Sequence, residues 1–151
     1  MADQQLTLDQ FTQEVLAYPT YLRTGDFSDA LLKCAPIITE AFGDNFAKQE
    51  TAGGEAWPER KDPIPKHPLL ILTSKLIQAA VGGGPGHVER VWSHEINVGV
   101  DCGTVPYAAV HEYGWPERNI PSREYLGVDD NHLEQCRETI EEGVYVAMFD
   151  I

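Results

Sequence analysis

The side chains with the clearest chemical potential in this chain are a few histidines and one neighbouring glutamate. His87, His94 and the pair His111-Glu112 could supply imidazole ligands, a general base or a carboxylate for metal-dependent hydrolysis. A helical zinc motif, however, needs two histidines four residues apart with a glutamate between them. No second histidine follows His111-Glu112, because the chain continues as Tyr113-Gly114-Trp115-Pro116. A small metal-dependent hydrolase using His94, His111 and Glu112 is therefore the alternative hypothesis and not the first.

A structural role for His111 is simpler. In a short helix, Tyr107 and His111 would lie one turn apart, which allows a hydrogen bond or ring stacking between them. No Gly-x-Ser-x-Gly nucleophile motif occurs, and the glycine run at 82–86 lacks the Gly-Lys-Ser/Thr ending of a phosphate loop. The three cysteines are an odd set at wide spacing, which argues against a disulfide framework and a paired-cysteine zinc site. We therefore expect no enzyme activity, no metal and no cofactor.

The charge of the chain is strongly negative and unevenly distributed. The formal net charge is −13, which divides into −5, 0 and −8 over residues 1–50, 51–100 and 101–151. An acidic surface repels phosphate, so we do not expect tight or sequence-specific DNA binding. No apolar run of membrane length and no basic-then-apolar leader occurs, so we also expect a soluble, unexported protein with no membrane partner.

The length and the mixture of helical and strand patterns predict a single α+β domain over residues 1–151. We expect three to four helices, including a C-terminal one, packed with a small antiparallel sheet. Helical spacing of apolar residues first occurs at 6–16 and should end at Pro19. A wide apolar stripe follows at 30–46, where Pro36 should kink or restart the helix.

The middle of the chain is divided by proline and glycine. Residues 50–68 lose the apolar periodicity and contain four prolines, which predicts a long, extended arm suited to reaching neighbouring subunits. Trp57 is the exception within this arm, because a buried tryptophan would anchor it. Helical patterning resumes near Leu72, where Thr73 or Ser74 can cap the helix.

Strand patterns follow in the second half. Alternating apolar residues predict a hairpin at about 87–101, and a third strand near 124–128 would return to it. Asp129 or Asp130 should then cap a C-terminal helix with apolar residues at helical spacing.

Residues 105–130 form a connector whose backbone path is tightly specified. Three prolines fix φ and remove backbone donors, while Gly114 and Gly127 can take the positive φ values that tight turns require. Arg118 and Arg123 are two of only three bases in residues 101–151. Intersubunit salt bridges and ordinary surface charge are both open uses for them.

Two blocks of this connector resemble the phage virion morphogenesis family, also called tail completion proteins. They are Tyr107-Ala108-Ala109-Val110-His111-Glu112-Tyr113-Gly114 and Ile120-Pro121-Ser122-Arg123-Glu124-Tyr125-Leu126-Gly127. Matching elements also precede them: Phe46, then Gly54-Glu55-Ala56-Trp57-Pro58, and Leu70-Ile71-Leu72-Thr73-Ser74-Lys75-Leu76, in which Ser74 replaces the family's usual glycine. The resemblance extends from Phe42 to the C-terminus, and upstream of it we identify none.

This resemblance implies a structural virion protein that forms a ring at the head-proximal end of a phage tail, completing the tail and joining it to the head. It implies a hexameric homo-oligomer, partners among the tail tube, sheath and head-closure or neck proteins, and a place in the tail or neck of the virion after assembly in the host cytoplasm. An acidic lumen in such a ring would let DNA pass without binding. A tail assembly factor absent from the finished virion is a second alternative.

The candidate interface or structural residues come from the blocks that carry the resemblance and from the two arginines. A guanidinium at position 123 could make a bidentate bond to a carboxylate of a neighbouring subunit. The candidates are Trp57, Tyr107, His111, Gly114, Arg118, Pro121, Arg123 and Tyr125.

Overall fold

The computed structural model describes residues 8–62, 69–70 and 74–149. This part of the chain contains five α-helices, one short 3-10 helix and a two-stranded antiparallel sheet, which confirms the predicted α+β class with one helix more than expected. The elements are α1 (Leu8–Thr24), α2 (Ser28–Lys48), α3 (Lys75–Val81), β1 (His87–Val91), β2 (Ile96–Val100), α4 (Ala108–Tyr113), η1 (Pro116–Arg118) and α5 (Asp130–Phe149). No helix of the described part is both long and apolar enough to cross a membrane.

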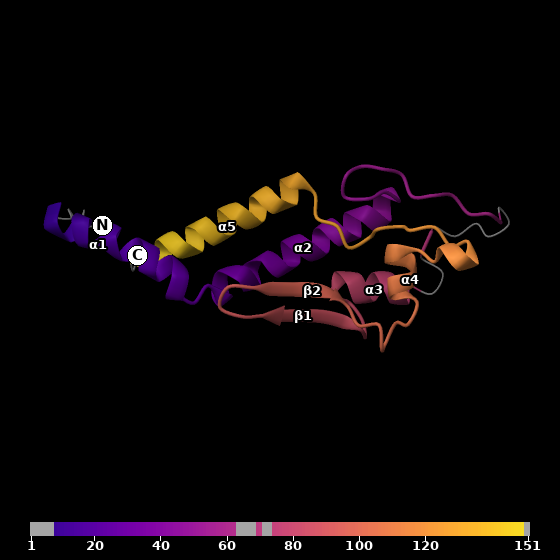
Figure 1. The fold of residues 1–151 in the computed structure, drawn as a ribbon, viewed down its shortest axis with the longest axis horizontal. Helices are drawn as coiled ribbons and strands as arrows, with labels where there is room; N and C mark the ends of the chain where they lie inside the picture. Colours follow the sequence, from indigo (N-terminus) through magenta and orange to yellow (C-terminus); the bar gives the residue numbers. More distant parts are fainter. Residues whose placement is uncertain (1–7, 63–68, 71–73, 150–151) are drawn as a thin grey trace.

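The molecule is elongated, with different elements at its two ends (Figure 1). Helices α2 and α5 run along the long axis, and the hairpin of β1 and β2 lies beside α2. Helices α3 and α4 lie at one end, and α1 projects at the other.

Small residues let α2 and α5 pack closely. A Cβ atom on Gly143 would lie 2.6 Å from the Cβ of Ala30, so the two helices touch at this point. Further along the same interface, the thiol of Cys34 lies 3.7 Å from the carbonyl oxygen of Cys136. Burial raises the pKa of Cys34 to about 11, so this thiol stays protonated and unreactive at neutral pH.

Two prolines that were expected to interrupt helices lie inside them. Helix α1 passes through Pro19 and ends at Thr24, and α2 continues through Pro36. Pro36 leaves the carbonyl of Leu32 without its helical donor, but Leu32 lies on the exposed face of α2, where water can bond that carbonyl. The predicted end at Pro19 and a restart at Pro36 are therefore wrong.

Strands β1 and β2 confirm the predicted hairpin. Their register pairs His87 with Val100 and Val91 with Ile96. The loop between them has four residues and is closed by a 2.8 Å hydrogen bond from the N–H of Trp92 to the carbonyl of Glu95. A loop of this length does not need the positive φ values of a two-residue turn.

The third strand expected near residues 124–128 does not form. This segment belongs to no strand of the described chain, and the sheet there has only β1 and β2. The N–H groups of Tyr125 and Leu126 donate instead to the carboxylate of Glu112, at 2.9 and 3.1 Å. Because these donors are used by a side chain, they are not available to a neighbouring strand.

Of the N-terminal caps predicted for α3 and α5, the structure confirms only the one at α5. Ser74 precedes α3 with φ of 57°, a left-handed conformation, and its hydroxyl makes no capping hydrogen bond. This backbone conformation suits the glycine that the family usually has there. Thr73 lies outside the described residues. Asp129 is the cap of α5, because its carboxylate accepts the N–H of His132 at 3.0 Å.

The main hydrophobic core lies at the end of the molecule that carries α3 and α4. It joins the C-terminal part of α2, the start of the proline-rich arm, α3, α4 and the segment that leads to α5. Its buried residues are Phe46, Trp57, Leu76, Ala79, Ala80, Val105, Ala108 and Tyr125.

Candidate functional site

The residues that carry the family resemblance meet around the carboxylate of Glu112, on α4. This side chain points back toward the connector, where its Oε2 atom accepts the N–H groups of both Tyr125 and Leu126. Burial raises the pKa of Glu112, and the two hydrogen bonds oppose that shift. Glu112 therefore joins α4 to the segment after Pro121.

Tyr125 is the central side chain of this junction and is fully buried. Its hydroxyl donates to the carbonyl of Ala108 at 3.0 Å, and its ring lies 5.3 Å from that of Phe46. The buried amide of Asn45 donates to the carbonyl oxygens of Tyr125 and Gly127, at 3.1 and 2.9 Å. The connector is thus held by α4 on one side and by α2 on the other.

Trp57 ties the start of the proline-rich arm to the same junction. Its ring packs edge-on against Phe46, with centroids 5.6 Å apart, and its indole N–H donates to the carbonyl of Glu124 at 3.1 Å. Residues 51–55 form a turn before it, closed by a 2.8 Å hydrogen bond from Thr51 to Glu55. The anchoring role predicted for a buried Trp57 fits this geometry, while residues 63–68 of the arm lie outside the described part.

Gly114 and Pro121 shape the return of the connector. Gly114 has φ of 75° and ψ of 173°, which is a region that only glycine occupies readily. A Cβ atom there would lie 2.7 Å from the backbone nitrogen of Ser122 and 3.1 Å from the carbonyl carbon of Pro121. The hydroxyl of Ser122 donates to the carbonyl of Glu112 at 2.6 Å, which closes the loop.

The two arginines of the connector have different surroundings. Arg123 is 8% exposed, and its guanidinium donates to the carbonyl oxygens of Pro58 and Glu59 at 2.9 and 3.2 Å. It therefore holds the arm within its own chain through two backbone carbonyls. The bond from Arg123 to a carboxylate of a neighbouring subunit stays a prediction. Arg118 is exposed and lies over the ring of Trp115, 4.5 Å from its centroid.

Tyr107 and His111 stack across one turn of α4, as the sequence spacing suggests. Their rings meet edge to face with centroids 5.9 Å apart. Burial, together with the nearby charge of Arg123, lowers the pKa of His111, so its imidazole is neutral at pH 7. Its Nδ1 atom is buried and has no hydrogen-bond partner among the described residues.

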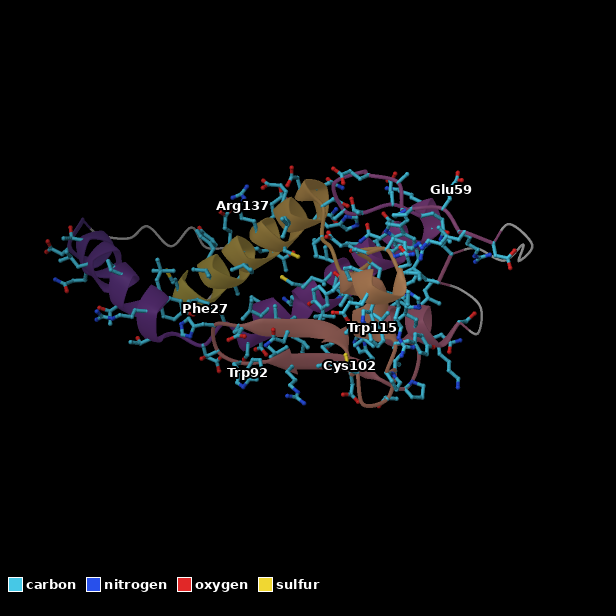
Figure 2. The ribbon with its side chains drawn as sticks, turned by 45° about the vertical axis from the view of Figure 1, so that its right-hand side comes forward. Phe27, Glu59, Trp92, Cys102, Trp115 and Arg137 are labelled. Carbon is cyan, nitrogen blue, oxygen red and sulfur yellow. The ribbon has the colours of Figure 1, made fainter. Side chains whose placement is uncertain are left out.

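The alternative hydrolase site is not assembled. His94 lies in the hairpin loop, with its ring 5.2 Å from that of Phe27. Figure 2 shows Phe27 beside the hairpin turn that carries Trp92, whereas Trp115, which follows α4, lies toward the other end of the molecule. No group of three histidine, cysteine or acidic side chains in the described part could hold a metal ion. The His94, His111 and Glu112 hypothesis therefore fails on geometry.

A sequence model of the phage virion morphogenesis family matches residues 7–144 of the 151-residue chain. The chain belongs to this family. It therefore acts in the assembly of phage virions, and its family is a structural and assembly family. No curated protein and no solved structure matches the chain.

The family match also corrects the N-terminal limit of the resemblance, which the sequence placed at Phe42. The match begins at residue 7 and so includes α1 and the N-terminal part of α2. Within the family blocks, Tyr125 and Gly114 build the junction of α4 with the connector. The structural roles of Glu112 and Asn45 are not predicted by the sequence. The spacing of Glu112 thirteen residues before Tyr125 has no regular period that would indicate a contact.

We predict that Glu112→Ala destabilises the fold by about 2–3 kcal/mol, because two part-buried N–H groups lose their acceptor. Glu112→Gln keeps an acceptor oxygen and should change stability by less than about 1 kcal/mol at pH 7. Chemical denaturation measures both. Equal losses in the two variants would contradict the proposed role of the carboxylate.

The pH dependence of folding stability, compared between wild type and Glu112→Gln, tests the role of Glu112 in a second way. Since the folded state raises the pKa of Glu112 above its ordinary value of 4.5, the folded protein holds this proton more tightly than the unfolded chain. The contribution of Glu112 to stability is therefore greatest below 4.5 and falls as pH rises through the raised pKa. Glu112→Gln should lack this dependence, so wild type should lose stability relative to it between pH 4 and 7.

We expect Arg123→Lys to cost about 1–2 kcal/mol of folding stability, because an ammonium group does not reproduce the fork that reaches two carbonyl oxygens. Arg118→Lys is the control and should change stability by less than about 0.5 kcal/mol, since Arg118 is exposed. An unchanged melting temperature for Arg123→Lys, accompanied by weaker self-association, would support the intersubunit salt bridge instead.

Proposed function

We propose that this protein is a structural component of the phage tail that forms a ring at the head-proximal end, completes the tail and joins it to the head. Membership of the phage virion morphogenesis family over nearly the whole chain carries this proposal. Its partners are further copies of itself and proteins of the tail tube, the sheath or the head closure and neck. It has no catalytic role.

The use that the fold makes of its family blocks supports a structural role. Four side chains make backbone hydrogen bonds and packing contacts within the chain: those of Glu112, Tyr125, Asn45 and Trp57. Arranged in this way, the blocks give a rigid junction that holds the exposed α4–η1 segment in a fixed position. A rigid, shaped surface is what repeated contacts in a symmetric assembly require.

The experiment that tests this function is removal of the gene from its phage or prophage, followed by electron microscopy of the particles. We expect heads filled with DNA and tails that do not join, with restoration by the wild-type gene. Antibody labelling of complete virions should mark the junction of head and tail. Labelling at the distal end would contradict the proposal, and absence from virions by mass spectrometry would favour the assembly factor.

We predict negligible DNA binding by the isolated protein at physiological salt. The chain has 24 acidic and 11 basic residues, and tight binding to phosphates needs clustered lysine or arginine. Fluorescence anisotropy with a labelled duplex, repeated over a range of salt concentrations, measures this. Submicromolar binding would contradict the passive passage of DNA through the proposed ring.

A further inference from the structure

Large apolar side chains are exposed at both ends of the elongated molecule. The aromatic end, at α4 and η1, is defined by Tyr107, Tyr113, Trp115 and Arg118. The second end, called here the α1–α5 end, is defined by exposed residues of α1 and of the C-terminal half of α5: Leu16, Leu22, Tyr145 and Val146. Figure 1 places α1 and the last turns of α5 at the end opposite α4.

The aromatic end has the composition of a protein-binding surface. Tyr113 is 78% exposed, and Trp115 has Arg118 stacked on its ring. Tyrosine, tryptophan and arginine are the residue types that contribute most to binding energy at interfaces. Tyr113 also borders an open groove of about 540 Å³, which Pro58 and Lys61 also line.

Two basic side chains at the aromatic end, Arg118 and Lys61, have no carboxylate partner in the described part of the chain. Lys61 donates to a backbone carbonyl, that of Asn119. Glu117 at this end is bonded to the indole N–H of Trp115, and Glu59 lines the same groove as Lys61. This end therefore suits a partner with exposed carboxylates.

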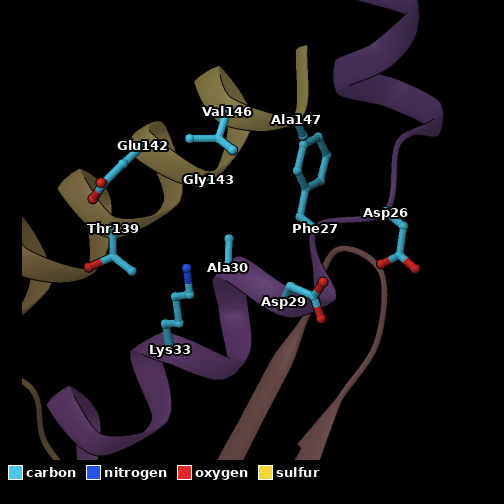
Figure 3. Close-up of a pocket in the computed structure, with 10 residues that line it drawn as sticks. All are labelled: Asp26, Phe27, Asp29, Ala30, Lys33, Thr139, Glu142, Gly143, Val146 and Ala147. Carbon is cyan, nitrogen blue, oxygen red and sulfur yellow. The ribbon is translucent and has the colours of Figure 1, made fainter. Parts of the chain in front are cut away.

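The α1–α5 end offers such carboxylates. Glu142, in the C-terminal half of α5, and Glu138, one turn before it, are both exposed, and neither has an ion-pair partner among the described residues. Two like charges at this spacing repel each other, so a basic partner would be favourable. Glu142 borders a groove of about 270 Å³ between α2 and α5, which is also lined by Phe27, Val146 and the basic Lys33 (Figure 3).

Helix α1 is also placed for contact with another molecule. It makes few contacts with the other elements, and Leu16 and Leu22 on it are exposed. A helix that carries apolar residues without covering them gains stability from a partner surface.

We propose that the aromatic end of one copy of this chain docks onto the α1–α5 end of the next copy. The two ends differ in composition and are complementary in charge, so the contact is heterologous and leaves one free end on each new copy. Such a contact closes into a ring when the rotation between copies allows it. The inference rests on the proposed ring and specifies the two faces that form it.

The test compares self-association of full-length variants by analytical ultracentrifugation. Tyr113→Ser/Arg118→Glu disables the aromatic end, and Glu138→Lys/Glu142→Lys disables the α1–α5 end. Each should weaken self-association at least tenfold, with melting curves like that of wild type because all four residues are exposed. Glu40→Lys, at an exposed position of α2 that lines neither groove, is the control and should assemble normally.

Mixing the two disabled variants separates this arrangement from others. Each variant keeps one intact end, so the mixture should form a heterodimer and nothing larger. Normal assembly of either double variant alone, or no heterodimer in the mixture, would overturn the proposal. A wild-type chain that stays monomeric at every concentration would overturn the choice of a second copy as partner.

The outcomes also separate this inference from the proposed function. If labelling marks the chain at the head–tail junction but the two double variants assemble normally, the faces are wrong and the tail role stands. If the heterodimer forms but the chain is absent from virions, the faces are right and the tail role is wrong.

Discussion

Trp57→Ala should destabilise the folded protein by about 3–5 kcal/mol, the range found when a buried aromatic side chain is removed from a core. The indole is 4% exposed, packs against Phe46 and donates a hydrogen bond to the carbonyl of Glu124. Its loss removes the contact that attaches the arm to the core and leaves the carbonyl of Glu124 without this donor. For a domain of this size we expect the melting temperature to fall by about 10 °C or more.

Trp92→Ala is the matched control, because Trp92 is 48% exposed in the hairpin loop. Its removal deletes the same atoms but only about half as much buried surface, so we expect a clearly smaller loss of stability than for Trp57→Ala. Thermal and chemical denaturation of the two variants measure the difference. Similar losses in both would show that Trp57 does not anchor the arm.

The sequence predicts the parts of the fold that depend on local periodicity. The apolar stripe of α2, the alternation in β1 and β2 and the apolar spacing in α5 each indicate the element that forms. The prolines mislead because their effect depends on which side of a helix they occupy. Pro36 is tolerated since the carbonyl it leaves unpaired faces solvent, and this orientation follows from tertiary packing.

The candidate site is predicted less completely, because its contacts join residues far apart in the chain. The blocks at 107–114 and 120–127 indicate where the site lies. They do not show that the carboxylate of Glu112 takes the donors that a strand near 124–128 would need, or that Asn45 reaches Tyr125 from α2. The partners of Arg123 cannot be predicted from the sequence for the same reason. The residues next to an arginine do not show whether it will bond to backbone carbonyls of its own chain or to a neighbouring subunit.

Gly114→Ala should cost about 3 kcal/mol or more, because the substitution combines two unfavourable effects. The backbone at Gly114, with φ of 75° and ψ of 173°, is accessible to glycine and strained for alanine. The added methyl group would also lie 2.7 Å from the backbone nitrogen of Ser122 and 3.0 Å from the carbonyl oxygen of Ile120. Neither atom belongs to a flexible side chain, so the connector itself must move to admit the methyl group.

Gly54→Ala isolates the first of these effects. Gly54 also has positive φ, at 83°, but a Cβ atom there meets nothing within 4 Å. We expect a loss of only about 1 kcal/mol for this control. The additional loss of stability in Gly114→Ala, relative to Gly54→Ala, then measures how closely the backbone at Gly114 approaches the backbone at residues 120–122. Because this approach fixes where Trp115 and Arg118 lie, Gly114→Ala should also weaken self-association at temperatures where the variant is still folded. Equal losses of stability in the two variants would show that the connector adapts to the methyl group and that its path is not rigid.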